Sequence, residues 1–147
     1  MRKPWLRPLA LIAVLVSISA SAASAPPSAE DYLKVLTNGP WPLEILAFCY
    51  STIDKDPTFQ AVGKRWRERN DGLLRTVEDK AASVDIPAQV RRKADEASLA
   101  AIRRLAARQY DKPAWCRTLA QVIDGGAYDI DRRSDLEAPL KRIFGKP

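Results

Sequence analysis

The chain has 147 residues, of which 24 are basic and 18 are acidic, and it contains two cysteines and no histidine. The lack of histidine excludes Ser-His-Asp and Cys-His nucleophiles, histidine-ligated zinc or copper, and histidine-ligated haem. We therefore expect neither a cofactor nor a bound metal ion.

Residues 1–22 have the composition of a secretory signal peptide. Three basic residues precede an uncharged apolar run at 9–16, and small residues follow it, with Ala22 completing a match to the A-x-A cleavage rule. The apolar run is too short to span a hydrocarbon layer of about 30 Å. We expect cleavage after Ala22, a flexible start at 23–27, and a single helical domain at 28–147 in the periplasm or outside the cell.

Cleavage also lowers the net charge. It removes three basic residues and no acidic ones, so +6 becomes +3. A net charge of this size gives only mild attraction to anionic surfaces. Because we expect the protein to be exported, and no later segment is long and apolar enough to cross a bilayer, we expect neither a nucleic-acid partner nor a stable membrane anchor.

Proline and glycine divide the rest of the chain into helical segments without strand alternation. Ser28 caps a first helix that ends at Asn38-Gly39, where glycine accepts a left-handed backbone. A second helix at about 42–54 is apolar over most of its surface. Asp56-Pro57 begins a third helix of about 25 residues, in which Asn70-Asp71-Gly72 predicts a kink.

A fourth helix at about 87–110 is rich in alanine and has two neighbouring apolar stripes. One stripe consists of Val90, Ala94, Ala97, Ala101 and Leu105; beside it lie Leu99, Ile102 and Ala106. A fifth helix begins at Lys112-Pro113, and Ser134 with Glu137 has capping-box spacing for a last one. The sequence therefore predicts an all-α bundle of five or six helices with short connections.

Cys49 and Cys116 lie in apolar stripes of the second and fifth helices. Two cysteines in an exported chain have one possible intramolecular pairing, so we expect a structural disulfide that stabilises the fold by roughly 4 kcal/mol. The alternative is a reactive or metal-binding thiol. A cysteine on an early helix paired with one on a late helix is similar to the arrangement in periplasmic amidase-immunity proteins. The similarity is architectural and implies no site residues.

Basic residues and tryptophans form a candidate surface for a partner or an anion. In segment 64–69 we expect Trp66 to face inward and its basic neighbours to keep their charged ends in water. Trp41, between two prolines, is either a contact point for a partner or a lid over one end of the bundle. Whether the basic groups of the third and fourth helices share one face stays open. The candidate surface comprises Trp41, Lys64, Arg65, Arg67, Arg69, Arg103 and Arg104.

Two acidic features have ordinary explanations. Segment 124–131 is rich in aspartate but lacks the glycine that an EF-hand requires at its sixth position, so we expect its aspartates to pair with Arg132 and Arg133 instead of calcium. Glu44 interrupts an apolar helix, where burial would raise the pKa of a catalytic carboxyl. Its place in the first helical turn also explains it, since a carboxylate is favourable there.

These features favour an exported, soluble binding protein without catalytic activity, of the inhibitor, immunity-protein or chaperone type. Its partner would be another envelope or secreted protein. One alternative is a periplasmic protein that binds a small anion or a lipid. Another is a cell-wall enzyme that relies on carboxylates, beginning with Glu44.

Overall fold

The computed structural model describes residues 25–145, which form six α-helices and a short 3-10 helix and contain no strand. The predicted all-α fold is confirmed, whereas the predicted signal peptide lies outside the described residues. In chain order the helices are α1 (Ala29–Asn38), α2 (Trp41–Thr52), α3 (Pro57–Ala81), α4 (Ala88–Ala107), α5 (Lys112–Asp124), η1 (Ile130–Arg132) and α6 (Ser134–Phe144).

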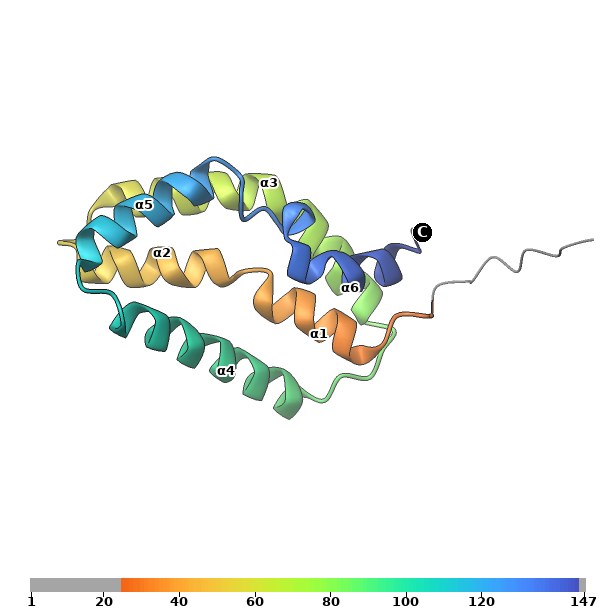
Figure 1. Ribbon diagram of the computed structural model, residues 1–147. Helices are drawn as coiled ribbons and strands as arrows, with labels where there is room; N and C mark the ends of the chain where they lie inside the picture. Colours follow the sequence, from red (N-terminus) through yellow and green to blue (C-terminus); the bar gives the residue numbers. More distant parts are fainter. Residues whose placement is uncertain (1–24, 146–147) are drawn as a thin grey trace, which may run out of the picture.

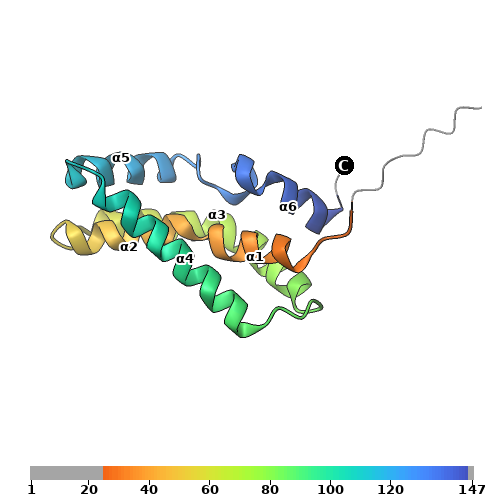
Figure 2. The same ribbon diagram turned by 60° about the horizontal axis from the view of Figure 1, so that its bottom comes forward.

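Helices α1 and α2 lie end to end through the middle of the bundle (Figure 1). The long helix α3 packs against both of them, α5 packs against α2 and α3, and α6 packs against α1. On the other side, α4 runs obliquely across α1 and α2 (Figure 2). Among the described residues, no helix is long and apolar enough to cross a membrane.

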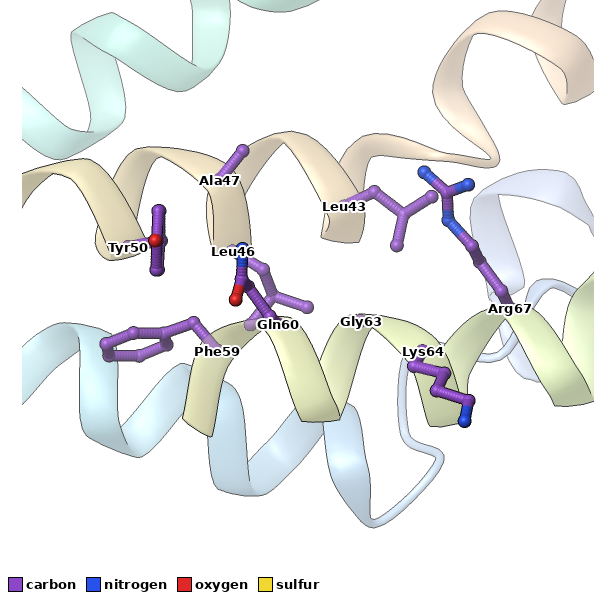
Figure 3. A pocket seen from close by; sticks show the side chains of 9 residues that line it. All are labelled: Leu43, Leu46, Ala47, Tyr50, Phe59, Gln60, Gly63, Lys64 and Arg67. Atoms are coloured by element: carbon purple, nitrogen blue, oxygen red, sulfur yellow. The ribbon is translucent and has the colours of Figure 1, made fainter. Parts of the chain in front are cut away.

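One continuous apolar core joins these helices. It is built mainly on α2 and α3, which pack side by side (Figures 1 and 3), and α5 and α6 close it from the side away from α4. Burial of large apolar side chains is the main stabilising contribution to such a bundle. The largest fully buried side chains are Trp66, Phe59, Ile45, Ile123, Ile130, Leu136, Val35, Val77 and Pro42, together with the two cysteines.

Local sequence signals set most helix starts as predicted. Ser28 and Asp31 form a reciprocal capping box at α1, with the Ser28 backbone N–H 2.9 Å from Asp31 Oδ2. The Asp56 side chain caps α3 at Thr58 N, and the Asp111 side chain caps α5 at Ala114 N.

Two local predictions need correction. Gly39 ends α1 with a right-handed backbone (φ −54°). A Cβ there would clash with the Val35 carbonyl oxygen and lie 3.2 Å from Ile130 Cδ1, so close packing explains the glycine. Helix α3 is continuous through Gly72, and the kink expected there stays a prediction. The capping box expected at Ser134 does not form, because Ser134 is already helical and the N-cap position belongs to Arg133.

Candidate functional site

The two cysteines form the predicted disulfide. Cys49 on α2 and Cys116 on α5 are fully buried, their sulfurs are bonded, and their Cα atoms are 5.6 Å apart. This bond joins segments separated by 67 residues and fixes α5 against α2. Both sulfurs are therefore occupied by a structural role.

The basic segment 64–69 is divided between structure and surface. The Arg65 guanidinium donates to both carboxylate oxygens of Asp124, at 2.7 and 3.0 Å, and holds the pKa of that carboxyl below its usual range. Arg69 donates to Asp129 at 2.9 Å and to the Ile123 carbonyl at 2.8 Å. These two arginines attach α3 to the end of α5 and to the loop that follows it. Lys64 and Arg67 remain on the outer surface.

Trp66 faces inward, as predicted. Its ring is fully buried, and its indole N–H donates to the Tyr128 carbonyl at 3.0 Å. A buried tryptophan with its donor satisfied is a core residue. It therefore does not belong to a ligand-binding surface.

Asn70 is a structural residue that the sequence analysis did not identify as such. Its buried amide donates to the Trp66 carbonyl at 2.8 Å and to Asp129 Oδ1 at 3.0 Å, and its oxygen accepts the Ile130 N–H at 2.8 Å. A polar residue at an inward helical position was the available signal. As part of Asn70-Asp71-Gly72, the residue instead predicts a kink.

The aspartates of segment 124–131 serve this same attachment. Asp124 and Asp129 pair with Arg65 and Arg69 of α3, and not with Arg132 and Arg133 as expected. The reason is tertiary: α3 lies directly beside this loop. Within residues 25–145, no group of three or more potential ligands could hold a metal ion.

Arg133 and Trp41 close one end of the bundle. The Arg133 guanidinium is largely buried, donates to the Asn38 and Gly39 carbonyls at the end of α1, and pairs with Asp135 at 2.7 Å. The guanidinium also lies 5.6 Å from the centre of the Trp41 ring, which packs edge-on against Tyr128. Trp41 is half-buried in these contacts, so of its two interpretations the lid fits the packing.

A second buried charge joins the first and last helices. Arg142 donates to Asp31, with Nε 3.0 Å from Oδ2, and this contact lowers the pKa of Asp31 to about 2. Asp31 also accepts from Ser28, which adds to the stabilisation of the charged form. From the sequence, Asp31 is predictable only as part of a cap.

Glu44 is exposed in the first turn of α2. This exposure removes the apolar burial on which the catalytic interpretation depended. The ordinary interpretation, a carboxylate placed favourably at a helix start, accounts for the residue.

Helix α4 presents an apolar stripe to solvent. The inward stripe is the one that contains Ile102 and Ala106, whereas Val90 and Leu105 of the other stripe are each 45% exposed. With 100° per residue, Arg104 borders the exposed stripe and Arg108, the C-cap of α4, lies in line with the stripe at its end, while Arg103 lies on the opposite flank of the buried face. We call Val90, Ala94, Ala97, Ala101, Leu105, Lys93, Arg104 and Arg108 the α4 surface.

A groove lies between α2 and α3, on the side of α2 away from α4 (Figure 3). It has a volume of about 360 Å³. Helices α3 and α4, which carry the basic groups, thus lie on different sides of α2 (Figures 1 and 3). The groove is lined by Leu43, Leu46, Ala47, Tyr50, Phe59, Gln60, Gly63, Lys64 and Arg67.

Comparison of the chain with protein-family models, with characterised proteins and with solved structures finds no match. Any function must therefore be argued from the α4 surface, the α2–α3 groove and the residues that support them.

Proposed function

We propose that this chain is an exported protein that binds another exported protein without catalysing a reaction, in the manner of an inhibitor, an immunity protein or a chaperone. The observation that carries the proposal is the α4 surface. It combines exposed apolar side chains with basic side chains on one helix, the composition that peptide- and protein-binding helices use.

The positive charge of the chain is concentrated at α4. Segment 88–108 holds six basic and two acidic residues, whereas residues 23–87 and 109–147 together hold 15 basic and 16 acidic residues. Of the six basic residues in this segment, Arg91 forms an ion pair with Glu78. The other five form no ion pair with any described residue and can attract an acidic partner.

The packing of α4 supports the same conclusion. Helix α4 packs against α1 and α2 along one face and leaves the stripe from Val90 to Leu105 open to solvent. Among the ion pairs of residues 25–145, none joins Asp95 or Glu96 to the basic side chains that border this stripe. An apolar stripe with a basic border is complementary to a partner that has an apolar ridge or cleft surrounded by carboxylates.

Three carboxylates of the fold are held in their charged form by arginines. The pKa values of Asp31, Asp124 and Asp135 all lie below the usual range, in each case chiefly because an arginine donates to the carboxylate. A catalytic acid needs the opposite shift, toward neutral pH. These carboxylates therefore suit the fold and not an acid–base mechanism.

The proposal can be tested with a photo-crosslinking residue in place of Ala101 in the exported protein. We expect a crosslinked adduct with an acidic exported protein. The adduct should be lost when Arg104→Glu and Arg108→Glu are combined, and kept with Arg75→Glu, a control at an exposed arginine of α3.

A second control places the same crosslinker at Ala61, which is exposed on α3 away from both candidate sites. An identical adduct from Ala61, or an adduct that is indifferent to the charge of Arg104 and Arg108, would count against the α4 surface. Circular dichroism of each variant verifies that the helices are intact.

A further inference from the structure

We infer that the α2–α3 groove binds a small amphiphilic anion, one with a single short apolar chain and a carboxylate or similar head group. The groove lies across α2 from the α4 surface, so this inference does not depend on the proposed protein partner.

The walls of the groove suit an apolar chain. Tyr50 and Phe59 lie at one end, and Leu43 and Leu46 form the wall on α2 (Figure 3). Gly63 forms part of the α3 wall, where a Cβ would lie 3.6 Å from Leu43 Cδ2. Any side chain longer than alanine at this position would project into the groove or against its leucines.

The other end of the groove is positively charged. Arg67 rises from α3 toward Leu43 (Figure 3), and among the ion pairs of residues 25–145 none involves Arg67. Lys64 also lines the groove and reaches only Glu68, at 3.9 Å, with both side chains largely exposed. A planar guanidinium without a partner is suited to bidentate contact with a carboxylate.

The surrounding charges are consistent with this polarity. Glu44 and Glu68 are the nearest acidic residues in sequence to the groove residues of their helices, but neither lines the groove. The adjacent arginines, Arg65 and Arg69, are held by Asp124 and Asp129. Arg67 is therefore the guanidinium of this segment that is available to a ligand.

The size of the groove limits the ligand. Its volume of about 360 Å³ lies at the lower end of the range of about 300–1,000 Å³ that is usual for small-molecule sites. We therefore choose a small ligand, a medium-chain carboxylate with about eight carbons. Its chain would contact the aromatic end and its head would reach Arg67.

Octanoate is the probe for this site, with 1-octanol as its uncharged counterpart. Titration into the isotopically labelled mature protein, followed by NMR, should shift the signals of Tyr50 and Phe59 with octanoate. We expect Arg67→Gln to weaken octanoate binding about tenfold, the effect of losing one exposed charge-assisted contact. Arg75→Gln is the matched control and should bind as the wild type does.

A second pair of variants tests the cavity without altering charge. Gln60 is exposed on α3 and points across the groove toward α2 (Figure 3), so Gln60→Trp should block octanoate while leaving the fold intact. Ala61→Trp places the same bulk elsewhere on α3 and should not affect binding. Circular dichroism and thermal melts of the four variants confirm that any loss is local.

Three results would overturn the inference. The first is no shift with octanoate at millimolar concentration. The second is equal binding of octanol and octanoate, or binding indifferent to Arg67, which would leave only nonspecific apolar contact. The third is association with vesicles of anionic phospholipid in the absence of octanoate binding, which would make this region a membrane contact.

Discussion

Helices α3 and α4 are similar in sequence character but differ in what their basic side chains contact. Both are long, amphipathic and rich in arginine and lysine. On α3, Arg65 and Arg69 are held by aspartates, and Trp66 and Asn70 are buried between them. On α4, the side chains bordering the exposed stripe pair with no described residue. A basic amphipathic helix thus becomes structural where acidic groups face it and remains a surface where none do.

The difference follows from the neighbours of each helix. Helix α3 packs against α1, α2 and α5, whereas α4 packs against α1 and α2 along a single face. Substitutions on α3 and its supports should therefore reduce the stability of the fold. Substitutions on the exposed face of α4 should instead change binding.

The largest effect should come from the disulfide, which holds α5 in place beside α3. Replacing both cysteines, Cys49→Ala with Cys116→Ala, should lower the free energy of unfolding by about 4 kcal/mol, since the bond closes a loop of about 67 residues. Urea unfolding of the variant and the wild type measures this loss. A loss below about 1 kcal/mol would show that α5 docks without its covalent link.

Asn70 should have the next largest effect. Asn70→Ala removes three hydrogen bonds and leaves the Ile130 N–H buried without its acceptor, so we expect a loss of about 2–3 kcal/mol. Thr76→Ala is the control, because Thr76 is exposed on the same helix and bonds only to the Gly72 carbonyl. Equal melting temperatures for the two variants would contradict a stabilising role for Asn70.

The buried carboxylate of Asp31 should make the stability of the fold depend on pH. The pKa of Asp31 is lowered to about 2 in the folded protein, below its value in an unfolded chain. Its contribution is therefore present above about pH 4 and is lost as the pH falls toward 2, at a cost of about 2 kcal/mol. Asp31→Asn should flatten this part of the stability profile, and an unchanged profile would contradict the assignment.

The smallest effect should come from α4. Combining Arg104→Gln with Arg108→Gln should change the free energy of unfolding by no more than about 0.5 kcal/mol, since both side chains are exposed and unpaired among the described residues. Hydrogen exchange should also be faster in α4 than in α3, because fewer contacts hold α4 to the bundle. A marked destabilisation by these arginine variants would contradict the proposed difference between α3, which supports the fold, and α4, which offers a binding surface.

Much of the fold was predictable because its signals are local. Ser28, Asp56 and Asp111 stand where helices begin, and prolines follow two of these caps. Apolar spacing placed Trp66 inward and both cysteines in buried stripes. Errors arose at Ser134 and at Gly39, where the backbone conformation depends on what packs against the segment.

The candidate sites were less predictable than the fold. The groove between α2 and α3 combines residues from 43 to 67, and its opening depends on how the two helices pack against each other. Arg67 was one of four basic residues in segment 64–69, and nothing in that segment separates it from Arg65 and Arg69. Their aspartate partners lie about 60 residues farther along the chain.

Helix identity, helix limits and the choice of disulfide partner follow from the sequence, since caps, proline, apolar period and cysteine count act locally or leave a single option. Which apolar stripe of α4 faces inward, and which arginines are neutralised, emerged only from the assembled bundle. In an isolated helix, both apolar stripes and all charged side chains are exposed to water alike. Contacts with distant segments bury one stripe, pair some charges and leave the rest in water.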